Sequence, residues 1–193
     1  LLRRFLVTRF EQEDPEGFTD VVARVACSLE REGRATDAIE LARTSHQLEL
    51  LADILERQCS GAIFRGASAS LARAFEVIRP EMLDSRPLLR AHRARVLAEV
   101  GHATEAKEDA EQLLGDESLP GTVRLHALLA KVRAHRFLGE VEEMQKVFYS
   151  VRAMPECDDP AVMGELAYHE ANFAVSVAAD YARGERLLRT ALD

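Results

Sequence analysis

The sequence predicts an all-α fold built from antiparallel helix pairs. Residues that favour helices (Ala, Leu, Glu and Arg) dominate the 193 residues, and only 10 Gly and 6 Pro interrupt them. No run rich in Val, Ile or Thr alternates with polar residues as a strand would. The hexapeptides GRATDA (33–38) and GHATEA (101–106) are nearly identical and lie 68 residues apart, which is twice 34. The chain is therefore expected to be a helical repeat with a period near 34 residues.

Glycines mark the expected turn inside each helix pair. Four of them follow one another at intervals of 33, 35 and 38 residues, and a fifth turn is expected 40 residues later. These turns are Gly33, Gly66, Gly101 and Gly139, followed by Ala179. Glycine ends a helix easily because it adopts the left-handed conformation, and a 34-residue period is typical of tetratricopeptide repeats. We therefore predict a tetratricopeptide-like right-handed superhelix of antiparallel helix pairs.

Five residues after each turn, the second helix of the pair is expected to face the first. Ala38 and Ala106 stand there after the first and third turns, and their small size lets two helices approach closely. The corresponding residues after the other turns are Leu71, Met144 and Gly184, and one helical turn later stand Ala42, Phe75, Ala110, Phe148 and Leu188. A single helix pair cannot bury its apolar face, so such pairs stack.

Prolines indicate where several helices begin, because the first helical turn tolerates proline. Pro15, Pro87, Pro120 and Pro160 each precede a helical apolar pattern. Connections are expected at 80–87, 115–121 and 155–160. Residues 15–193 are then about five helix pairs of one repeat domain that is truncated at its C-terminal end. Since both ends of the chain read as helix, we expect a fragment of a longer protein.

The segment GRATDAIELARTSHQLELLADILE resembles part of the large ATP-binding LuxR-type bacterial transcription regulators, the group that includes the maltose-regulon activator. The shared features are a turn glycine followed by Ala-Ile, a small-residue turn, and a helix with paired apolar residues. In this chain they are Gly33, Ala38, Ile39, the turn at 44–47, and Ala52, Ile54 and Leu55. Leu41, His46 and Leu48 depart from the family's frequent His, Gly and Trp, which leaves the subgroup and its inducer open.

The resemblance covers roughly residues 1–115 and has implications for the parent protein. It implies an N-terminal switch ATPase and a C-terminal helix-turn-helix elsewhere in the parent chain. Residues 1–14 would be the end of a preceding winged-helix-type region, or else an N-terminal capping helix. The resemblance also implies that this helical domain recognises an inducer or partner. The chain itself has no GxxxxGK[ST] phosphate loop, so we expect it neither to bind nor to hydrolyse ATP.

Composition limits the partners of this segment. A net charge of −8 argues against direct contact with nucleic acid, which needs clustered positive charge. No apolar run approaches the length of a membrane span. Three widely spaced cysteines, Cys27, Cys59 and Cys157, form no metal motif and favour a reducing cytoplasm with mostly buried thiols. We expect a cytoplasmic protein with no cofactor.

The closest approach to a catalytic motif is YHEANF at 168–173. A zinc-protease helix needs a second His four residues after His169, but that position is Phe173. Glu165 and His169 are spaced as a surface pair on one helix. The CDD sequence at 157–159 offers too few oxygens for Ca²⁺. We therefore expect no metal site and no enzymatic activity.

A binding groove is the better candidate for a functional site. In a tetratricopeptide stack the first helix of each pair lines the concave face, so positions nine and six before each turn should project into it. These positions are Arg24, Cys27, Arg57, Ser60, His92, Arg95, Ala130, Arg133, Glu170 and Phe173, to which Arg136, three before the fourth turn, is added. Five arginines on this line would suit an acidic peptide, a carboxylate, a phosphate or another domain of the same protein. Alternatively, they are solvated arginines paired with glutamates of the same chain.

The leading hypothesis is the sensor or interaction domain of a bacterial transcription regulator. An inducer or a protein partner, which includes other domains of the parent chain, would occupy the groove and bias the switch state of the regulator. The second hypothesis is a free-standing tetratricopeptide adaptor without a role in transcription. A hydrolase on a helical scaffold is the weakest, and a homo-oligomer is left open.

Overall fold

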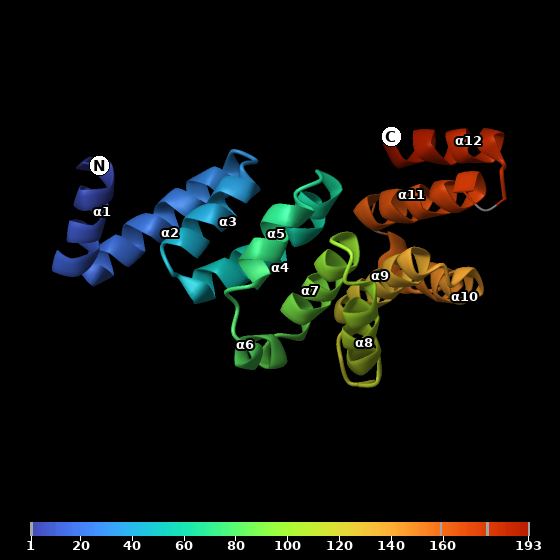
Figure 1. Ribbon diagram of the computed structural model, residues 1–193, viewed down its shortest axis with the longest axis horizontal. Helices are drawn as coiled ribbons and strands as arrows, with labels where there is room; N and C mark the ends of the chain where they lie inside the picture. The colour runs from blue at the N-terminus through green and yellow to red at the C-terminus, as the bar shows by residue number, and fades with distance from the viewer. Residues whose placement is uncertain (1, 159, 177, 193) are drawn as a thin grey trace. The chain divides into compact units, whose positions relative to one another are not determined.

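The computed structural model describes residues 2–158, 160–176 and 178–192, and the regular elements of these residues are all helices (Figure 1). They are α1 (Leu2–Glu13), α2 (Pro15–Arg31), α3 (Ala35–Thr44), α4 (Leu48–Phe64), α5 (Ser68–Phe75), α6 (Pro80–Ser85), α7 (Pro87–Glu99), α8 (Ala103–Leu114), α9 (Gly121–Leu138), α10 (Val141–Arg152), the short 3₁₀ helix η1 (Pro155–Asp158), α11 (Pro160–Ser176) and α12 (Tyr181–Leu192). The absence of strands from this part of the chain confirms the all-α prediction.

The chain divides into two compact units, residues 1–89 and 90–193. Helices α1 to α6 belong to the first unit and α8 to α12 to the second, while α7 contains the boundary. The predicted boundary after residue 14 falls between α1 and α2, which pack against each other inside the first unit. A superhelix that runs through both units stays a prediction.

The predicted turn glycines end their helices in the left-handed conformation. The φ angles are 74° at Gly33, 78° at Gly66, 96° at Gly101 and 73° at Gly139. After α2, the amide of Gly33 donates to the carbonyl of Glu30 (3.0 Å), and the amide of Arg34 donates to the carbonyl of Leu29 (2.8 Å). These are the two hydrogen bonds of a Schellman motif, and the same pair ends α4 and α9. One turn geometry thus recurs in both units.

Two further turns place residues other than glycine at positive φ. Ala179, the fifth predicted turn, has a φ of 51° and lies between α11 and α12. His46, with a φ of 54°, lies between α3 and α4. Glycine adopts this conformation without steric cost, whereas alanine and histidine do so less readily.

The first unit buries one face of α2 against α3. Phe18, Val22 and Ala26 are spaced four residues apart on α2, so they lie on one face, and all three are buried. Ala38 and Ala42 of α3 are fully buried, as their predicted position against the first helix requires. Helix α3 also packs on α4 and α5, so the core continues along the unit.

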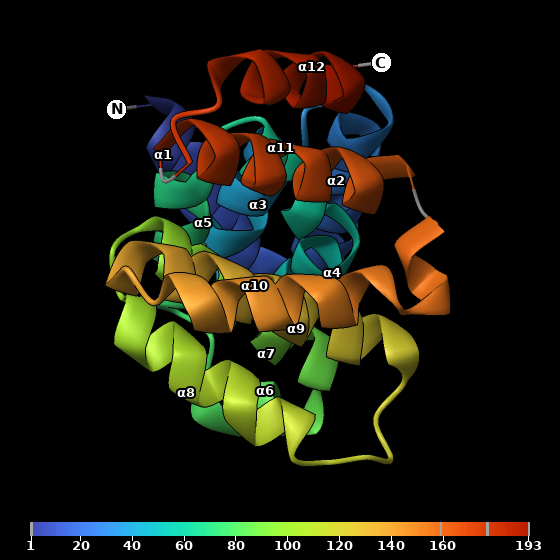
Figure 2. The same ribbon diagram turned by 90° about the vertical axis from the view of Figure 1, so that its right-hand side faces the viewer.

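In the second unit, α9, α10 and α11 share an apolar cluster. Its buried members are Leu125, Leu129, Val132, Met144, Val147, Val151, Val162 and Leu166. A smaller cluster of alanines joins α7, α8 and α9 and consists of Ala98, Ala103, Ala106 and Ala134. Figure 2 shows α12, α11, α10 and α8 in succession down this unit. Gly184 of α12 faces α11, and a Cβ atom there would overlap the side chain of Val175, so the small residue permits a close approach.

Most predicted helix starts are confirmed. Pro15, Pro87 and Pro160 are the first residues of α2, α7 and α11. Pro120 differs, because it is the N-cap of α9 and the helix begins one residue later. The predicted connection at 80–87 also differs, because it contains α6. Pro80 at the start of α6 and Glu81 in its first turn both favour a short helix.

The cysteines are less uniformly buried than the composition suggests. Cys59 is buried, but Cys27 is exposed, which contradicts its prediction. Cys27 directly follows the buried Ala26 on α2, so it points about 100° away from the buried stripe. The side chain of Cys157 and the position of Asp159 lie outside the described residues.

Among the described helices, none combines the length and the apolar character that crossing a membrane requires.

Candidate functional site

Two cavities that share a wall lie among helices α9 to α12 of the second unit. The first has a volume of about 190 Å³ and is lined by residues of all four helices. The second has a volume of about 400 Å³ and is lined by residues of α9, α10 and α11. Met144 and Phe173 line both cavities and form the wall between them.

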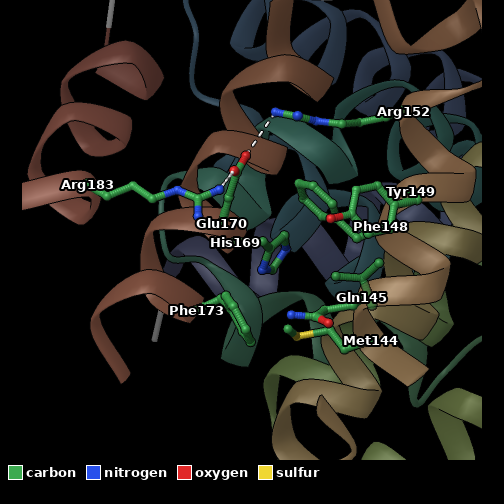
Figure 3. Close-up of a pocket in the computed structure, with 10 residues that line it drawn as sticks. Met144, Gln145, Phe148, Tyr149, Arg152, His169, Glu170, Phe173 and Arg183 are labelled. Atoms are coloured by element: carbon green, nitrogen blue, oxygen red, sulfur yellow. Dashed lines mark hydrogen bonds and ion pairs between the residues drawn. The ribbon is translucent and has the colours of Figure 1, made fainter. Parts of the chain in front are cut away.

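Apolar side chains form most of the inner surface of the first cavity. Met144 and Phe148 are four residues apart on α10, so they lie on the same face of that helix. Phe173 approaches from α11 on the opposite side, as Figure 3 shows. Val132 of α9 is fully buried beneath them. Together they form a surface on which an aromatic or branched apolar group can pack.

Two arginines and one glutamate form the charged rim of the first cavity. Nη2 of Arg152 donates to Oε2 of Glu170 (2.9 Å), and Nη2 of Arg183 donates to Oε1 of the same carboxylate (2.6 Å) (Figure 3). The Arg152 guanidinium also lies 5.1 Å from the ring centroid of Phe148, which helps to orient it. A guanidinium has five N–H donors, so both arginines have donors beyond the bond to Glu170. The rim therefore carries an excess of positive charge.

His169 lies at the inner end of the first cavity and is only 2% exposed. Its Nε2 atom is 3.7 Å from Oε1 of Glu165, which is too long for a hydrogen bond. Its Nδ1 atom has no hydrogen-bond partner among the described residues. Burial lowers the pKa of His169, and the positive charge of Arg133 lowers it further against the opposing effect of Glu165. The imidazole is therefore neutral at pH 7, with one donor and one acceptor nitrogen.

A buried ionic network lies behind His169. Oε2 of Glu165 accepts a hydrogen bond of 2.5 Å from Nη2 of Arg95, and Oε1 lies 3.9 Å from Nη1 of Arg133. Arg133 also forms an ion pair with Glu99. Burial alone would raise the pKa of Glu165, but Arg95, His169 and Arg133 outweigh it and hold that pKa well below its usual range. The four charged side chains thus balance, two positive against two negative, inside the unit.

A pair of histidine rings, one from α7 and one from α9, adjoins this network. Nη1 of Arg95 lies 3.0 Å from Nδ1 of His126, whose ring centroid is 4.5 Å from that of His92. His92 is 1% exposed, so it belongs to the interior of the second unit.

The structure brings together several of the predicted groove residues of the second unit, but not on an open surface. Arg95 and Arg133 approach the same carboxylate, yet they are only 1% and 6% exposed, and His92 is buried as well. Glu99 and Glu165 neutralise the two arginines, which makes their burial tolerable. The alternative of solvated arginines paired with glutamates of the same chain holds for this pair in its glutamate partners, but not in its solvation, because both arginines are buried.

The remaining predicted residues of the second unit lie nearer to the cavities. Arg136 and Phe173 line the second cavity together, and Phe173 and Glu170 also line the first. Arg136 is partly buried, with its guanidinium 4.8 Å from the ring centroid of Phe137. Ala130 is fully buried in the core.

In the first unit, the predicted groove residues lie along α2 and α4. Arg24 and Cys27 are exposed on α2. Arg57 pairs with Glu30 at 3.0 Å, and Ser60 is partly buried. The Arg57 pair again fits the alternative of internal glutamate partners.

Sequence reasoning missed two parts of the site. The prediction of Glu165 and His169 as a surface pair is wrong, because both are buried. A usable signal existed, since Glu165, His169 and Phe173 are spaced four residues apart and form one stripe on α11. Arg152 and Arg183 carried no signal, because only the packing of α10, α11 and α12 brings them to Glu170.

Within the described ranges, no three His, Cys, Asp or Glu side chains are grouped to hold a metal ion. Comparison of the chain with protein-family models, with curated proteins and with solved structures finds no match in any of the three. The likeness to the LuxR-type regulators therefore rests on the residues quoted for it and stays a prediction.

Proposed function

We propose that this chain is the sensor or protein-interaction domain of a bacterial transcription regulator, and that it binds an inducer or partner in the second unit. The observation that carries the binding role is the pair of cavities with an apolar interior and an arginine-rich rim in a protein of net charge −8. Two residues expected at a binding surface, Arg136 and Phe173, line the same cavity. The assignment to a transcription regulator rests on the sequence resemblance of residues 1–115.

Control of the regulator would require an occupant that binds its two states with different affinity. The buried network offers a physical route for such a difference. His169 lines the first cavity, Glu165 lies one helical turn before it, and Glu165 is bonded to Arg95 of α7. An occupant that moves His169 therefore disturbs a buried ion pair that links α11 to α7. A state in which this pair is intact would differ in affinity from one in which it is broken.

The alternative is a free-standing adaptor that scaffolds protein–protein contacts without a role in transcription. It uses the same cavities and the same helical scaffold. The sequence of the parent gene distinguishes the two functions. A gene that encodes an upstream phosphate loop and a downstream helix-turn-helix supports the regulator, whereas a gene that encodes neither supports the adaptor.

A substitution that fills the first cavity tests the binding role without assuming what binds. Gln145→Trp places a bulky ring among the lining residues, and Lys146→Trp places the same ring on an exposed position of α10 as a control. In the full-length parent regulator, we expect Gln145→Trp to abolish inducer-dependent transcription from a reporter promoter, while Lys146→Trp leaves it intact. An unchanged response in Gln145→Trp, with the protein folded, would overturn the role of this cavity.

A further inference from the structure

We propose that the first cavity binds a small amphipathic anion, namely a molecule with one apolar ring, one carboxylate and one hydroxyl or N–H donor. This inference rests on the proposed binding function and specifies the chemistry of the occupant. Three features of the cavity carry it: its size, the charge of its rim, and the buried imidazole at its inner end.

The size of the cavity favours a small molecule over a peptide segment. An apolar cavity of about 150 Å³ is enough to hold benzene. The first cavity, at about 190 Å³, therefore accommodates one ring with a short substituent. Phe148 of α10 and Phe173 of α11 lie on opposite sides of this volume, so a flat apolar ring packs between them (Figure 3).

The charge of the rim favours an anion. Arg152 and Arg183 both bind the single carboxylate of Glu170, whose side chain is only 14% exposed. The network behind the cavity is balanced, because Arg95 and Arg133 face Glu99 and Glu165. The buried network therefore supplies no net negative charge to neutralise the excess positive charge of the rim. A ligand carboxylate can accept hydrogen bonds from the donors of both guanidiniums that Glu170 does not use.

The imidazole of His169 favours a ligand with a hydrogen-bond donor. His169 is 2% exposed and lines the cavity, and its Nδ1 atom has no partner among the described residues. Nε2 faces the carboxylate of Glu165, which favours the proton on Nε2 and leaves Nδ1 as the acceptor. A buried acceptor without a partner costs free energy. A hydroxyl or N–H group of the ligand removes this cost when it donates to Nδ1.

The position of these groups also explains why the donor and the carboxylate should be close together in the ligand. His169 and Glu170 are consecutive residues of α11, and both line the cavity. An α-hydroxy acid attached to a ring has this arrangement. 3-Phenyl-lactate is therefore a suitable probe, 3-phenylpropanoate lacks only its hydroxyl, and 3-phenyl-lactamide lacks only its charge.

The test measures the affinity of the three probes for the full 193-residue chain by ligand-observed NMR and calorimetry. We expect 3-phenyl-lactate to bind most tightly, with each comparator weaker by about tenfold, the worth of one hydrogen bond or one charged contact. His169→Phe should remove the difference between 3-phenyl-lactate and 3-phenylpropanoate. Arg152→Gln should weaken both acids and leave the amide unchanged, whereas Lys146→Gln, on the exposed side of α10, should change none of them.

Glu170→Gln separates a ligand contact from a purely structural role. Loss of the competing carboxylate should strengthen the binding of both acids, whereas a structural role predicts weaker binding or none. Absence of binding of the acids to the wild-type chain at millimolar concentration would overturn the proposal, and so would equal affinity for the acid and the amide. Either of these two negative results could occur while Gln145→Trp still abolishes the reporter response. In that case the binding function stands and only the ligand class is wrong.

Discussion

Arg95 and Glu165 lie 70 positions apart in the chain, yet Nη2 of the arginine donates a 2.5 Å hydrogen bond to Oε2 of the glutamate. Their side chains are 1% and 11% exposed, so the bond lies in the interior of the second unit. It fixes α7 to α11 directly, although α8, α9, α10 and the short 3₁₀ helix η1 lie between these two helices in the sequence. This bond therefore joins two helices that are distant in sequence.

Removal of the negative charge of Glu165 should strongly destabilise the protein. Glu165→Gln leaves Arg95 and Arg133 facing a neutral amide in the interior, and loss of one partner of a buried pair costs about 3–5 kcal/mol. The free energy of unfolding in urea measures the effect. Glu143→Gln is the matched control, because Glu143 pairs with Lys146 at the surface and should cost less than about 1 kcal/mol. Equal costs for the two variants would contradict the prediction.

Stability should fall as the pH drops below the pKa of histidine in the unfolded chain. The folded state lowers the pKa of His169, mainly through burial, so near and below pH 6.5 the unfolded state binds more protons than the folded state. The carboxyl of Glu165, whose pKa is also lowered in the fold, adds a second loss below about pH 4.3. Urea unfolding between pH 7.5 and pH 5 should show the first of these losses.

His169→Phe should remove that first part of the pH dependence. In the wild-type protein, His169 can contribute at most about 1.4 kcal/mol per pH unit to the slope of the free energy of unfolding against pH. His102→Asn, at an exposed position before α8, is the control and should retain the slope. A slope that persists in His169→Phe would assign it to another group.

Enlargement of Ala106 should destabilise the alanine cluster of α7, α8 and α9. Ala106 is fully buried beside Ala98, Ala103 and Ala134, so a leucine there has no free space and should cost about 1–3 kcal/mol. Ala69→Leu on the exposed side of α5 is the control and should stay within about 0.5 kcal/mol. Thermal and urea unfolding both report the difference.

Replacement of Gly33 by L-alanine should destabilise the protein. Its φ of 74° disfavours any L side chain, so Gly33→Ala should cost about 1–2 kcal/mol, even though no atom outside the adjacent residues lies within 4 Å of the added Cβ. Gly115 has a φ of −69°, and Gly115→Ala should instead be neutral or stabilise the protein by up to about 1 kcal/mol. Opposite signs for the two variants in urea unfolding are the expected outcome.

Local features of the fold were predictable from the sequence, because they depend on neighbouring residues. The turns at Gly33 and Gly139 and the start of α2 at Pro15 follow from the conformational preferences of glycine and proline. The burial of Ala38 and Ala106 follows from their spacing after the turns.

The site was less predictable, because it depends on contacts between distant segments. Repeat spacing selected Arg95 and Arg133 as groove residues, but it carried no information about Glu99 and Glu165, which neutralise them. The same spacing cannot show whether a polar stripe faces solvent or another helix. His169 was therefore assigned to the surface, although it is 2% exposed and lines the first cavity.

The left-handed turns also have a consequence for chirality. At φ near +74°, the backbone of Gly33 has the conformation that a mirror-image amino acid prefers, and the residue is exposed to solvent. A D-alanine introduced at Gly33 by chemical ligation should therefore stabilise the protein by about 0.4–1 kcal/mol, because it restricts the unfolded chain without straining the turn. L-Alanine and D-alanine at Gly33 would then change the free energy of unfolding in opposite directions. The configuration of a single Cα atom would decide whether the substitution in the turn between α2 and α3 stabilises or destabilises the protein.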